Sequence, residues 1–565
     1  MLRRLTALTV VLAAALVTAA PAQGATLFTL IGHGWGHGIG MSQWGALGYA
    51  QHGWGYRDIL GHYYTGTGIS SLPSTAKERV LMTSNLSAAR FGSTTQPRAT
   101  SEGSNGAAHV LPAGSYRIEP GPQAGYERIW SYQAGKYVLT GLKSPVRVDP
   151  GSTALRLDEA TFRGFSGDHW HGSLRFVRSG SAIAVINVVG LDGYARGIVP
   201  CEMSASWLLA ALQVQAVAAR SYAWATRNPG DLYDAKDDTS DQTYCPIERE
   251  GATSIQAVTS TSRQIVTFHG SVAVTFYSSS SGGRTSSEQA SWYTQSGPDY
   301  LVPVPDPYDA AEGQNPNHTW PHRVFTSEGL AAKLGTSGSV LAVDHTIDAA
   351  SLRVMSLALH KSDGTTVNRT ASQAYSELAL KSTYFRLLGV TLNAPEHATA
   401  GVPFNVSGRA WPRPTGGVKL QYRLGTSITW VTATTMPQLD ADGRFTLPRQ
   451  NAQIVSFRLI RLDAISPVVK VGVHPAMTLV AGQTGFHGSF APYISGASVH
   501  LQRNSSGTWV TRDTAPVNAG GSFSFDTDPS AGQWRVWFDG DATHASGGSP
   551  AVTLGATVHV LVALG

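Results

Sequence analysis

The chain has 565 residues, which at about 150 residues per domain predicts three or four domains. It carries 42 Lys and Arg against 37 Asp and Glu, a formal net charge of +5, and only 14% of its residues are charged while 42% are hydrophobic. This balance excludes a long disordered or acidic solvating chain, which needs high net charge and few apolar groups. The two cysteines exclude a disulfide-dense miniprotein and a four-thiolate zinc module.

The amino terminus has the pattern of a secretory signal peptide. Arg3 and Arg4 precede an apolar run over residues 5–19, and small residues follow over 20–25. A charged start, a short apolar run and a small-residue cleavage site predict a signal peptide over residues 1–25. The alternative, a membrane anchor, needs about 20 apolar residues, and no other long apolar segment follows. We therefore expect a secreted chain without a membrane span, in a compartment where Cys201 and Cys245 can pair.

Residues 26–389 divide into three segments by composition. Residues 26–71 are rich in Gly, His and Trp, and residues 72–186 consist of short alternating runs separated by Gly, Pro and Ser, which predicts strands. Residues 187–389 contain the clearest helix, residues 207–224, which is rich in Ala and Leu and has neither Gly nor Pro. It is apolar nearly all round, so we expect a buried central helix, with Ser204 or Ser206 as its N-cap.

After Gly389 two segments share a loose pattern of short strands. Residues 390–473 and 474–565 each contain a strand with Leu-Gln close before an arginine, then a tryptophan, a Gly-x-Phe turn and a further strand, at a spacing of about 80 residues. The pattern predicts two immunoglobulin-like β-sandwiches in tandem, acting as a spacer or a wall-binding module. The fold class is thus α+β, a core of strands around a buried helix with a β-rich insertion, followed by two β-sandwiches.

Three stretches carry groups that suit chemistry. The first, residues 191–203, ends in Pro-Cys-Glu-Met, and a strand-like approach would place Glu202 at the start of the central helix. The positive end of that helix would favour an ionised carboxylate, whereas apolar Met203 and Trp207 would favour a protonated one. Considered alone, such a glutamate is more often a helix-capping residue.

The second stretch, residues 32–46, alternates glycine with other residues. Its spacing is G-x-G-x-G without an acidic residue about 20 positions on, so it is not a dinucleotide loop. Ser42 lacks the G-x-S-x-G frame of a hydrolase elbow, and the glycines between His33 and His37 disfavour a helical metal site. What remains is a loop that presents His37, Ser42 and Gln43 to a hydroxyl-rich ligand.

The third stretch runs from a strand into a polar turn. Tyr277 is followed by four serines, including Ser280 and Ser281, and by two glycines, with Trp292 and Tyr300 further on. Hydroxyls beside aromatic side chains are typical of a sugar site, although a plain loop has the same composition.

Together these stretches resemble the SpoIID/LytB family, named for the stage II sporulation protein D and an amidase enhancer. The most specific part is Pro200 to Met203 followed by a Trp-containing helix with Gln-Ala-Val-Ala-Ala-Arg-Ser-Tyr, and residues 353–385 resemble the end of the family's core. The resemblance covers residues 27–389 and not the two C-terminal modules. In the family the Gly-His-Gly loop follows the Ser-Thr-Tyr-Phe segment, whereas here it comes first. We therefore predict that residues 32–66 fold back beside the strand near Phe385.

The resemblance also implies the activity and its site. It implies a lytic transglycosylase acting on peptidoglycan with Glu202 as the catalytic residue and with no cofactor or nucleic acid. We expect the glycan to be bound by a set of polar side chains, namely His37, Ser42, Gln43, Tyr277, Ser280 and Ser281. Relatives often carry a cysteine pair near the segment matching residues 238–245, and some bind zinc there. This chain keeps only Cys245 there and has Cys201 before Glu202, which favours a disulfide over two free thiols or a metal.

Two other functions stay open at this point. Some family members enhance an amidase, so the chain could be a non-catalytic wall-binding protein with a cell-wall amidase as its partner. A zinc amidase or peptidase would need a ligand set, for which His169 and His171 are the only local candidates.

Overall fold

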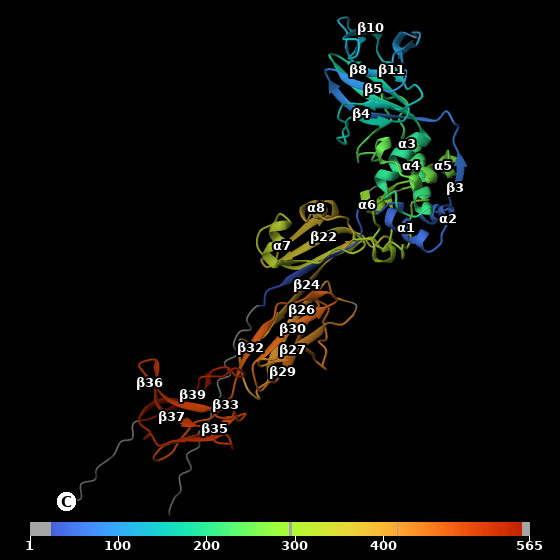
Figure 1. Ribbon diagram of the computed structural model, residues 1–565. Coiled ribbons are helices and arrows are strands. Elements are labelled where there is room, and N and C mark those ends of the chain that lie inside the picture. The colour runs from blue at the N-terminus through green and yellow to red at the C-terminus, as the bar shows by residue number, and fades with distance from the viewer. Residues whose placement is uncertain (1–23, 105, 293–296, 415, 556–565) are drawn as a thin grey trace, which may run out of the picture.

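The protein is described here by a computed structural model, which covers residues 24–104, 106–292, 297–414 and 416–555. It is elongated, with several units arranged in a row from the β-rich segment at one end to the last β unit at the other (Figure 1). The predicted signal peptide lies almost wholly outside these described residues. Among the helices of the described ranges, none is both long enough and apolar enough to span a bilayer.

The segment predicted to be a β-rich insertion forms two sheets around one apolar core. A six-stranded sheet has the order β10-β9-β8-β5-β12-β13, and a seven-stranded sheet has the order β16-β4-β15-β14-β11-β6-β7. The strands are β4 (Lys77–Leu86), β5 (Ala89–Ser93), β6 (Arg98–Ser101), β7 (His109–Val110), β8 (Gly114–Pro120), β9 (Tyr126–Ser131), β10 (Lys136–Lys143), β11 (Val146–Asp149), β12 (Leu155–Leu157), β13 (Asp168–Trp170), β14 (Ser173–Ser179), β15 (Ala182–Gly190) and β16 (Ala235–Lys236). Phe91, Phe176 and Trp170 are buried in the core between them.

A helical unit follows, with α4 (Leu209–Thr226) at its centre. The central helix predicted over 207–224 is therefore present two residues later, and it ends before Asn228-Pro229 because a residue before proline disfavours the helical conformation. Its N-cap is Leu208 without a side-chain hydrogen bond, so the expected cap by Ser204 or Ser206 is wrong. Most of its side chains are buried, among them Val217 and Ala218.

Four helices and several short strands pack around α4. The helices are α1 (Gln43–Gln51), α2 (Tyr56–Tyr63), α3 (Leu191–Glu202) and α5 (Ala252–Ser260), and α6 (Glu288–Trp292) lies near them. The short strands are β2 (Met41–Ser42), β3 (Gly68–Ser71), β17 (Gln264–Phe268), β18 (Ser271–Val272) and β19 (Tyr277–Ser278), of which β19 pairs with β2 in parallel. The strand-like approach expected directly before Glu202 is instead helix α3, with Pro200 in its last turn.

A smaller α/β unit comes next and receives the amino-terminal strand. It contains β1 (Leu27–Gly32), β20 (Arg323–Thr326), α7 (Ser327–Lys333), β21 (Val340–Ile347), β22 (Val354–Lys361), β23 (Thr366–Thr370), α8 (Ala371–Glu377) and β24 (Phe385–Asn393). β1 pairs antiparallel with β24, with Gly32 opposite Phe385, and the N–H of His33 donates to the carbonyl of Tyr384 at 2.9 Å. The predicted fold-back beside the strand near Phe385 is confirmed for the start of the segment, since the N–H of Gly36 also donates to the carbonyl of Lys381 at 2.9 Å. The remainder of residues 32–66 packs around α4 instead.

β24 also continues into the next unit, so it serves two cores. Phe385 and Leu387 are buried in the core of the α/β unit, whereas Leu388, Val390 and Leu392 are buried in the core that follows. The expected boundary after Gly389 therefore falls inside a strand. This strand joins the sheet β20-β1-β24-β26-β29 across both units.

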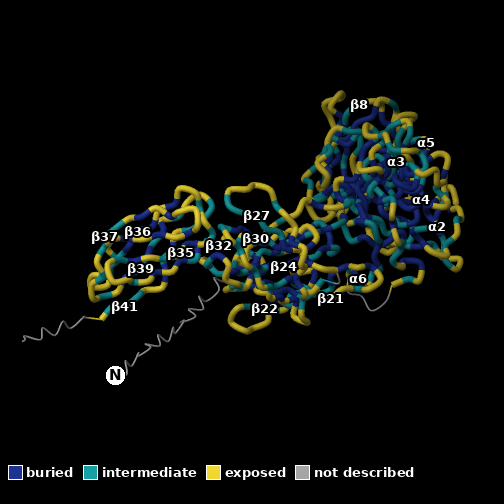
Figure 2. Tube along the Cα trace, turned by 90° about the horizontal axis from the view of Figure 1, so that it is seen from below, coloured by how far each residue is buried: buried dark blue, intermediate teal, exposed yellow. Residues whose placement is uncertain are grey.

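Two β units complete the described chain, each with sheets around its own apolar interior (Figure 2). The first adds β25 (His397–Thr399), β26 (Phe404–Trp411), β27 (Lys419–Leu424), β28 (Val431–Thr432), β29 (Arg444–Arg449), β30 (Val455–Arg461), β31 (Ala464–Ile465) and β32 (Val469–His474). The second contains β33 (Ala476–Met477), β34 (Val480–Ala481), β35 (Phe486–Ala491), β36 (Ser498–Ser505), β37 (Thr508–Pro516), β38 (Ser522–Phe525), β39 (Gly532–Phe538), β40 (Gly547–Gly548) and β41 (Val552–Leu554). The fold class is α+β and rich in strands; an immunoglobulin-like topology stays a prediction.

Candidate functional site

Glu202 lies where three segments of the chain meet. It is the last residue of α3 and is half-buried. Its Oε2 accepts a hydrogen bond from Nε2 of Gln43 at 3.0 Å, and its Oε1 accepts one from the backbone N–H of Thr243 at 2.9 Å. Glu202 thus sits at the C-terminal end of one helix, and the expected position at the start of α4 is wrong.

A disulfide fixes this meeting point. Cys201 and Cys245 form a disulfide, with their Cα atoms 6.3 Å apart and a sequence separation of 44. The bond ties the end of α3 to the segment that supplies the Thr243 donor. The disulfide brace therefore holds both sides of the hydrogen bond to Glu202.

Tyr277 belongs to the surroundings of Glu202 but contacts it through other residues. Its hydroxyl donates to Oε1 of Gln242 at 2.9 Å, and Gln242 directly precedes Thr243. Burial, together with the negative charge of Glu202, raises the pKa of Tyr277 well above its ordinary value. Tyr277 therefore stays a neutral hydrogen-bond donor that positions the Gln242-Thr243 segment.

The expected glycan-binding serines are buried around two aspartates. Ser42, Ser280 and Ser281 are each 1% exposed or less. Ser42 and Ser280 donate to Asp309 at 2.6 and 2.8 Å, and Ser281 donates to Asp306 at 2.8 Å. Their hydroxyls are engaged inside the protein, so direct contact with a glycan does not fit this structure.

Asp309 is the centre of this buried cluster. Besides the two serine hydroxyls, it accepts hydrogen bonds from the backbone N–H groups of Ser281 and Gly282, from Asn315 and from His318. Burial acts to raise the pKa of Asp309, but the hydrogen bonds from His318 and the serines outweigh it and lower the pKa. Burial and the nearby charge of Asp309 raise the pKa of Asp306 to about 8. One carboxylate is therefore ionised and the other protonated at neutral pH.

The glycine-rich loop packs against the serine turn. Gly34 has a φ of 74°, and a Cβ there would lie 2.7 Å from the carbonyl oxygen of Ser280. Trp35 and Ser280 exchange backbone hydrogen bonds of 2.8 and 3.1 Å. The alternating glycines thus permit close backbone contact within the protein, and the predicted exposure of this loop to a ligand does not explain them.

His37 borders a different pocket from the surroundings of Glu202. The pocket has a volume of about 410 Å3, and the residues that border it include His37, Trp292, Tyr375 and Ser382. Burial lowers the pKa of His37 to about 4, and its Nδ1 accepts a hydrogen bond from the N–H of Ile39 at 3.0 Å. Glu202 is not among the residues that border this pocket.

Several partners of the site come from outside the motifs and could not be predicted from them. Thr243 acts through its backbone, which no side-chain pattern reveals, and Gln215 lies 3.4 Å from the Gln43 amide. Trp44 and Trp207, both half-buried, form an aromatic pair with ring centroids 4.7 Å apart. Trp44 directly follows Gln43, so a tryptophan next to a motif residue was the available signal.

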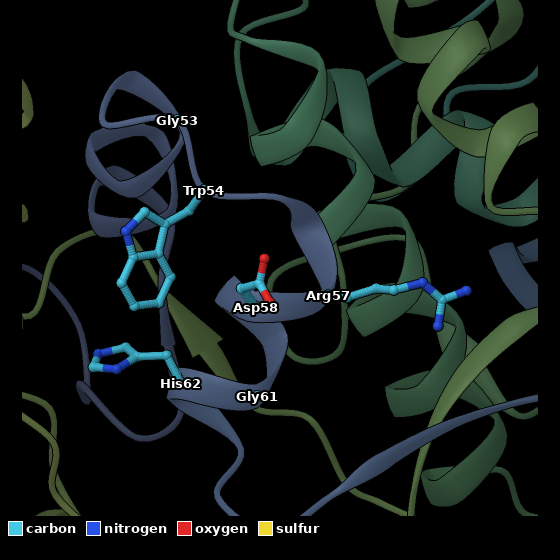
Figure 3. A pocket seen from close by; sticks show the side chains of 6 residues that line it. All are labelled: Gly53, Trp54, Arg57, Asp58, Gly61 and His62. Atoms are coloured by element: carbon cyan, nitrogen blue, oxygen red, sulfur yellow. The ribbon is translucent and has the colours of Figure 1, made fainter.

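Another pocket, with a volume of about 610 Å3, lies along α2 (Figure 3). The indole of Trp54 and the imidazole of His62 lie beside each other there, while the Arg57 side chain extends away from them. His62 Nε2 is already hydrogen-bonded to Tyr49 and to the carbonyl of Pro305. None of the predicted site residues borders this pocket.

The two histidines considered as zinc ligands are paired with glutamates. His169 contacts Glu248 at 2.7 Å, and His171 contacts Glu250 at 2.5 Å. Within the described ranges, no group of three or more His, Cys, Asp or Glu side chains has an arrangement that could hold a metal ion.

Comparison with known proteins places a family segment at the centre of this site. Residues 179–268 match the family model described as SpoIID, Stage II sporulation protein. They include Glu202, Thr243 and all of α4, but neither the glycine-rich loop nor the serine turn.

Two curated relatives cover a similar share of the chain. An uncharacterised protein of Brachyspira hyodysenteriae is 35% identical over 127 residues, which are 22% of this chain and 34% of that protein. The amidase enhancer of Bacillus subtilis is 35% identical over 118 residues, which are 21% of this chain and 16% of that protein. The chain thus spans about a third and about a sixth of these relatives. Among solved structures, murine CEACAM1b is 12% identical and covers 30% of this chain and 100% of its own, with a TM-score of 0.14, which supports no inference about the fold.

Proposed function

We propose that the protein is a secreted, cell-wall-associated lytic transglycosylase that cleaves the glycan strands of peptidoglycan. The observation that carries this proposal is the half-buried Glu202 carboxylate, held by Gln43 and Thr243 within a segment that matches the SpoIID family model. A lone carboxylate held by oriented donors is a suitable acid and base for a glycosidic bond.

One carboxyl group is enough for this reaction. Ordinary glycosidases need a second carboxylate as nucleophile or base. In a lytic transglycosylase the C6 hydroxyl of the sugar attacks its own anomeric carbon and forms a 1,6-anhydro ring. Glu202 protonates the departing glycosidic oxygen and then accepts the proton of that hydroxyl. The Gln43 amide and the Thr243 N–H stabilise the carboxylate that remains after the first step.

Trp44 and Trp207 would supply the stacking surface for the sugars. The two rings lie 4.7 Å apart, each half-buried and so partly open to solvent. Trp44 is attached to the same turn of α1 as Gln43, and Trp207 follows Glu202 by five residues. These two tryptophans replace the buried serines as the candidates for glycan contact, whereas Gln43, only 7% exposed, holds Glu202.

A second candidate function is supported by the relative named an amidase enhancer. In this alternative the chain binds the wall and a cell-wall amidase without cutting glycan itself. The two C-terminal β units would then act as immunoglobulin-like spacers or wall-binding modules.

Digestion of purified glycan strands separates the two functions. Products are analysed by mass spectrometry for the wild type, for Glu202→Gln and for the matched control Glu396→Gln, whose side chain is 82% exposed. Anhydro-ended fragments from the wild type and the control, but not from Glu202→Gln, support the transglycosylase. Uncut glycan with all three proteins, together with stimulation of an added amidase, supports the enhancer instead.

A further inference from the structure

A pocket with an excess of positive charge lies at the junction of the α/β unit and the first C-terminal β unit. Its volume is about 640 Å3, which is in the range of small-molecule sites. It is bordered by residues of β21 and β24, by the segment after β26, and by the turn between β30 and β31. Three arginines line it, namely Arg386, Arg413 and Arg461, with Asp344 as the single carboxylate.

Arg461 is buried without a partner for its charge. The residue is only 6% exposed, and both Nε and Nη1 are buried without a hydrogen-bond acceptor. Among the ion pairs of the described residues, none includes Arg461 or Arg386. A buried guanidinium is ordinarily paired, because an unpaired buried charge is strongly destabilising. Burial lowers the pKa of Arg461 to about 10, which leaves it positively charged at neutral pH.

His345 adds another unpaired donor to the same pocket. Its Nε2 accepts a hydrogen bond from the N–H of Leu387 at 3.0 Å, so in the neutral ring the proton is on Nδ1. That Nδ1 is buried and has no partner. Burial lowers the pKa of His345 to about 3, so the ring is neutral and its Nδ1–H is a free donor.

The one carboxylate at the pocket is engaged elsewhere. Asp344 accepts a hydrogen bond from Nε1 of Trp411 at 2.7 Å and contacts Nε2 of His360 at 2.7 Å. Within the described part of the chain, the ion pairs of Asp344 include only His360 and none of the three arginines. At the rim, Leu462 is 77% exposed and has a left-handed φ of 48°, so an apolar side chain is held in solvent beside the charged interior.

We infer that this pocket binds an oxyanion, a carboxylate or phosphate group of a ligand whose apolar part contacts Leu462. Arg461 and the Nδ1–H of His345 donate to the anion, and Arg386 contributes positive charge. Planar guanidinium groups suit both carboxylates and phosphates because they donate two parallel hydrogen bonds. The site is separate from Glu202 and does not depend on the proposed catalysis.

The test uses the full chain with inorganic phosphate and, separately, acetate as probes. Calorimetric titration and thermal melts are run at pH 7 with ionic strength held constant by chloride, on the wild type, Arg461→Met and Arg461→Lys. The matched control is Arg449→Met, because Arg449 lies in the same β unit, has a buried unpaired Nε and does not border the pocket.

We expect one probe to bind the wild type and the control at one site and to raise their melting temperature. Arg461→Met should bind at least tenfold more weakly while melting no lower than the wild type without anion, since removing an unpaired buried charge is neutral or stabilising. The tighter probe identifies the carboxylate or the phosphate as the ligand group. If neither probe binds the wild type, or if Arg449→Met weakens binding as much as Arg461→Met, the inference is overturned. Should Arg461→Met not fold, Arg461→Lys decides, because it keeps the charge but loses the paired donors and must also bind more weakly.

Discussion

Gln43 links two parts of the chain that the sequence separates by 159 residues. Its amide reaches Glu202 from the first turn of α1, while the Ser42 hydroxyl that begins this helix accepts the N–H of Gly45 at 3.0 Å. The helix start therefore orients the donor. A hydrogen bond to a charged group contributes about 1.5–3 kcal/mol, so Gln43 is a residue on which catalysis should depend.

We predict that Gln43→Ala lowers transglycosylase activity by about 10- to 100-fold, because each 1.4 kcal/mol of lost stabilisation is a factor of ten in rate. The matched control is Gln213→Ala, which removes a half-buried glutamine that donates to Ser260, away from Glu202. Initial rates of anhydro-product release measure both. Equal rates for the two variants would show that the contact with Glu202 has no role in the reaction.

At the residue level, the sequence predicts which chemical groups lie near the site better than it predicts where their side chains point. The Pro-Cys-Glu-Met pattern singles out Glu202, and the structure holds this carboxylate between two donors. The same reasoning assigned Ser280 and Ser281 to the ligand, because hydroxyls near aromatic residues suit sugars. Their actual partners, Asp306 and Asp309, lie 25 to 29 residues further on in the sequence. No local sequence pattern predicts that these two carboxylates are buried.

At the scale of elements, the buried aspartate cluster joins the glycine-rich loop to the serine turn. Asp306 is fully buried, and burial raises its pKa from 3.8 to about 8. A raised folded-state pKa means that the folded state binds the proton more tightly than the unfolded state. Its contribution to stability is therefore complete below about pH 4 and is lost as the pH rises through about 8.

We predict that Asp306→Asn, which keeps the shape but cannot ionise, flattens this part of the pH dependence. Between pH 5.5 and 8 the wild type should lose stability relative to the variant by at most about 1.4 kcal/mol per pH unit. Denaturant unfolding at several pH values measures the difference. Parallel curves for the two proteins would mean that Asp306 is ionised throughout.

The disulfide brace acts on a different pair of elements, α3 and the segment before η2 (Ile247–Arg249). It closes a loop of 44 residues, which in the chain-entropy model contributes about 4 kcal/mol. We predict that Cys201→Ser with Cys245→Ser lowers the free energy of unfolding by up to this amount and reduces activity, because the Thr243 donor is no longer fixed. Intact mass with and without reductant verifies the bond, and urea unfolding measures its contribution. Unchanged stability would contradict a bracing role.

Secondary structure was predictable where the pattern is long and uniform. The Ala- and Leu-rich run without Gly or Pro gives α4 with a shift of two residues. α3 was missed because Gly193, Gly197 and Pro200 all disfavour a helix when read locally. Packing overrides that preference: a Cβ at Gly197 would lie 2.4 Å from the ring of Tyr244, so this glycine lets α3 approach the segment that carries the disulfide.

At the scale of the whole molecule, β24 makes the α/β unit and the first C-terminal β unit interdependent. Alternate side chains of this one strand are buried in two cores, and its residues pair with β1 on one side and β26 on the other. The composition of the sequence changes after Gly389, but this position is not a boundary between independently folded units. The second C-terminal β unit differs, because its core is built only from residues after His474.

Two truncations follow from this arrangement. A chain ending at residue 389 loses Val390 and Leu392 together with the partners of Leu388, so we predict aggregation or loss of the cooperative melt of the α/β unit.

A chain ending at residue 474 keeps β24 and every core before it, and loses only a few contacts such as the hydrogen bond from the N–H of Ile454 to the carbonyl of Thr543. It should elute without aggregates and melt close to the full chain. Size-exclusion chromatography and circular dichroism melts compare the full chain with the two truncated chains. If the chain ending at residue 389 is as stable as the chain ending at residue 474, β24 does not couple the two units.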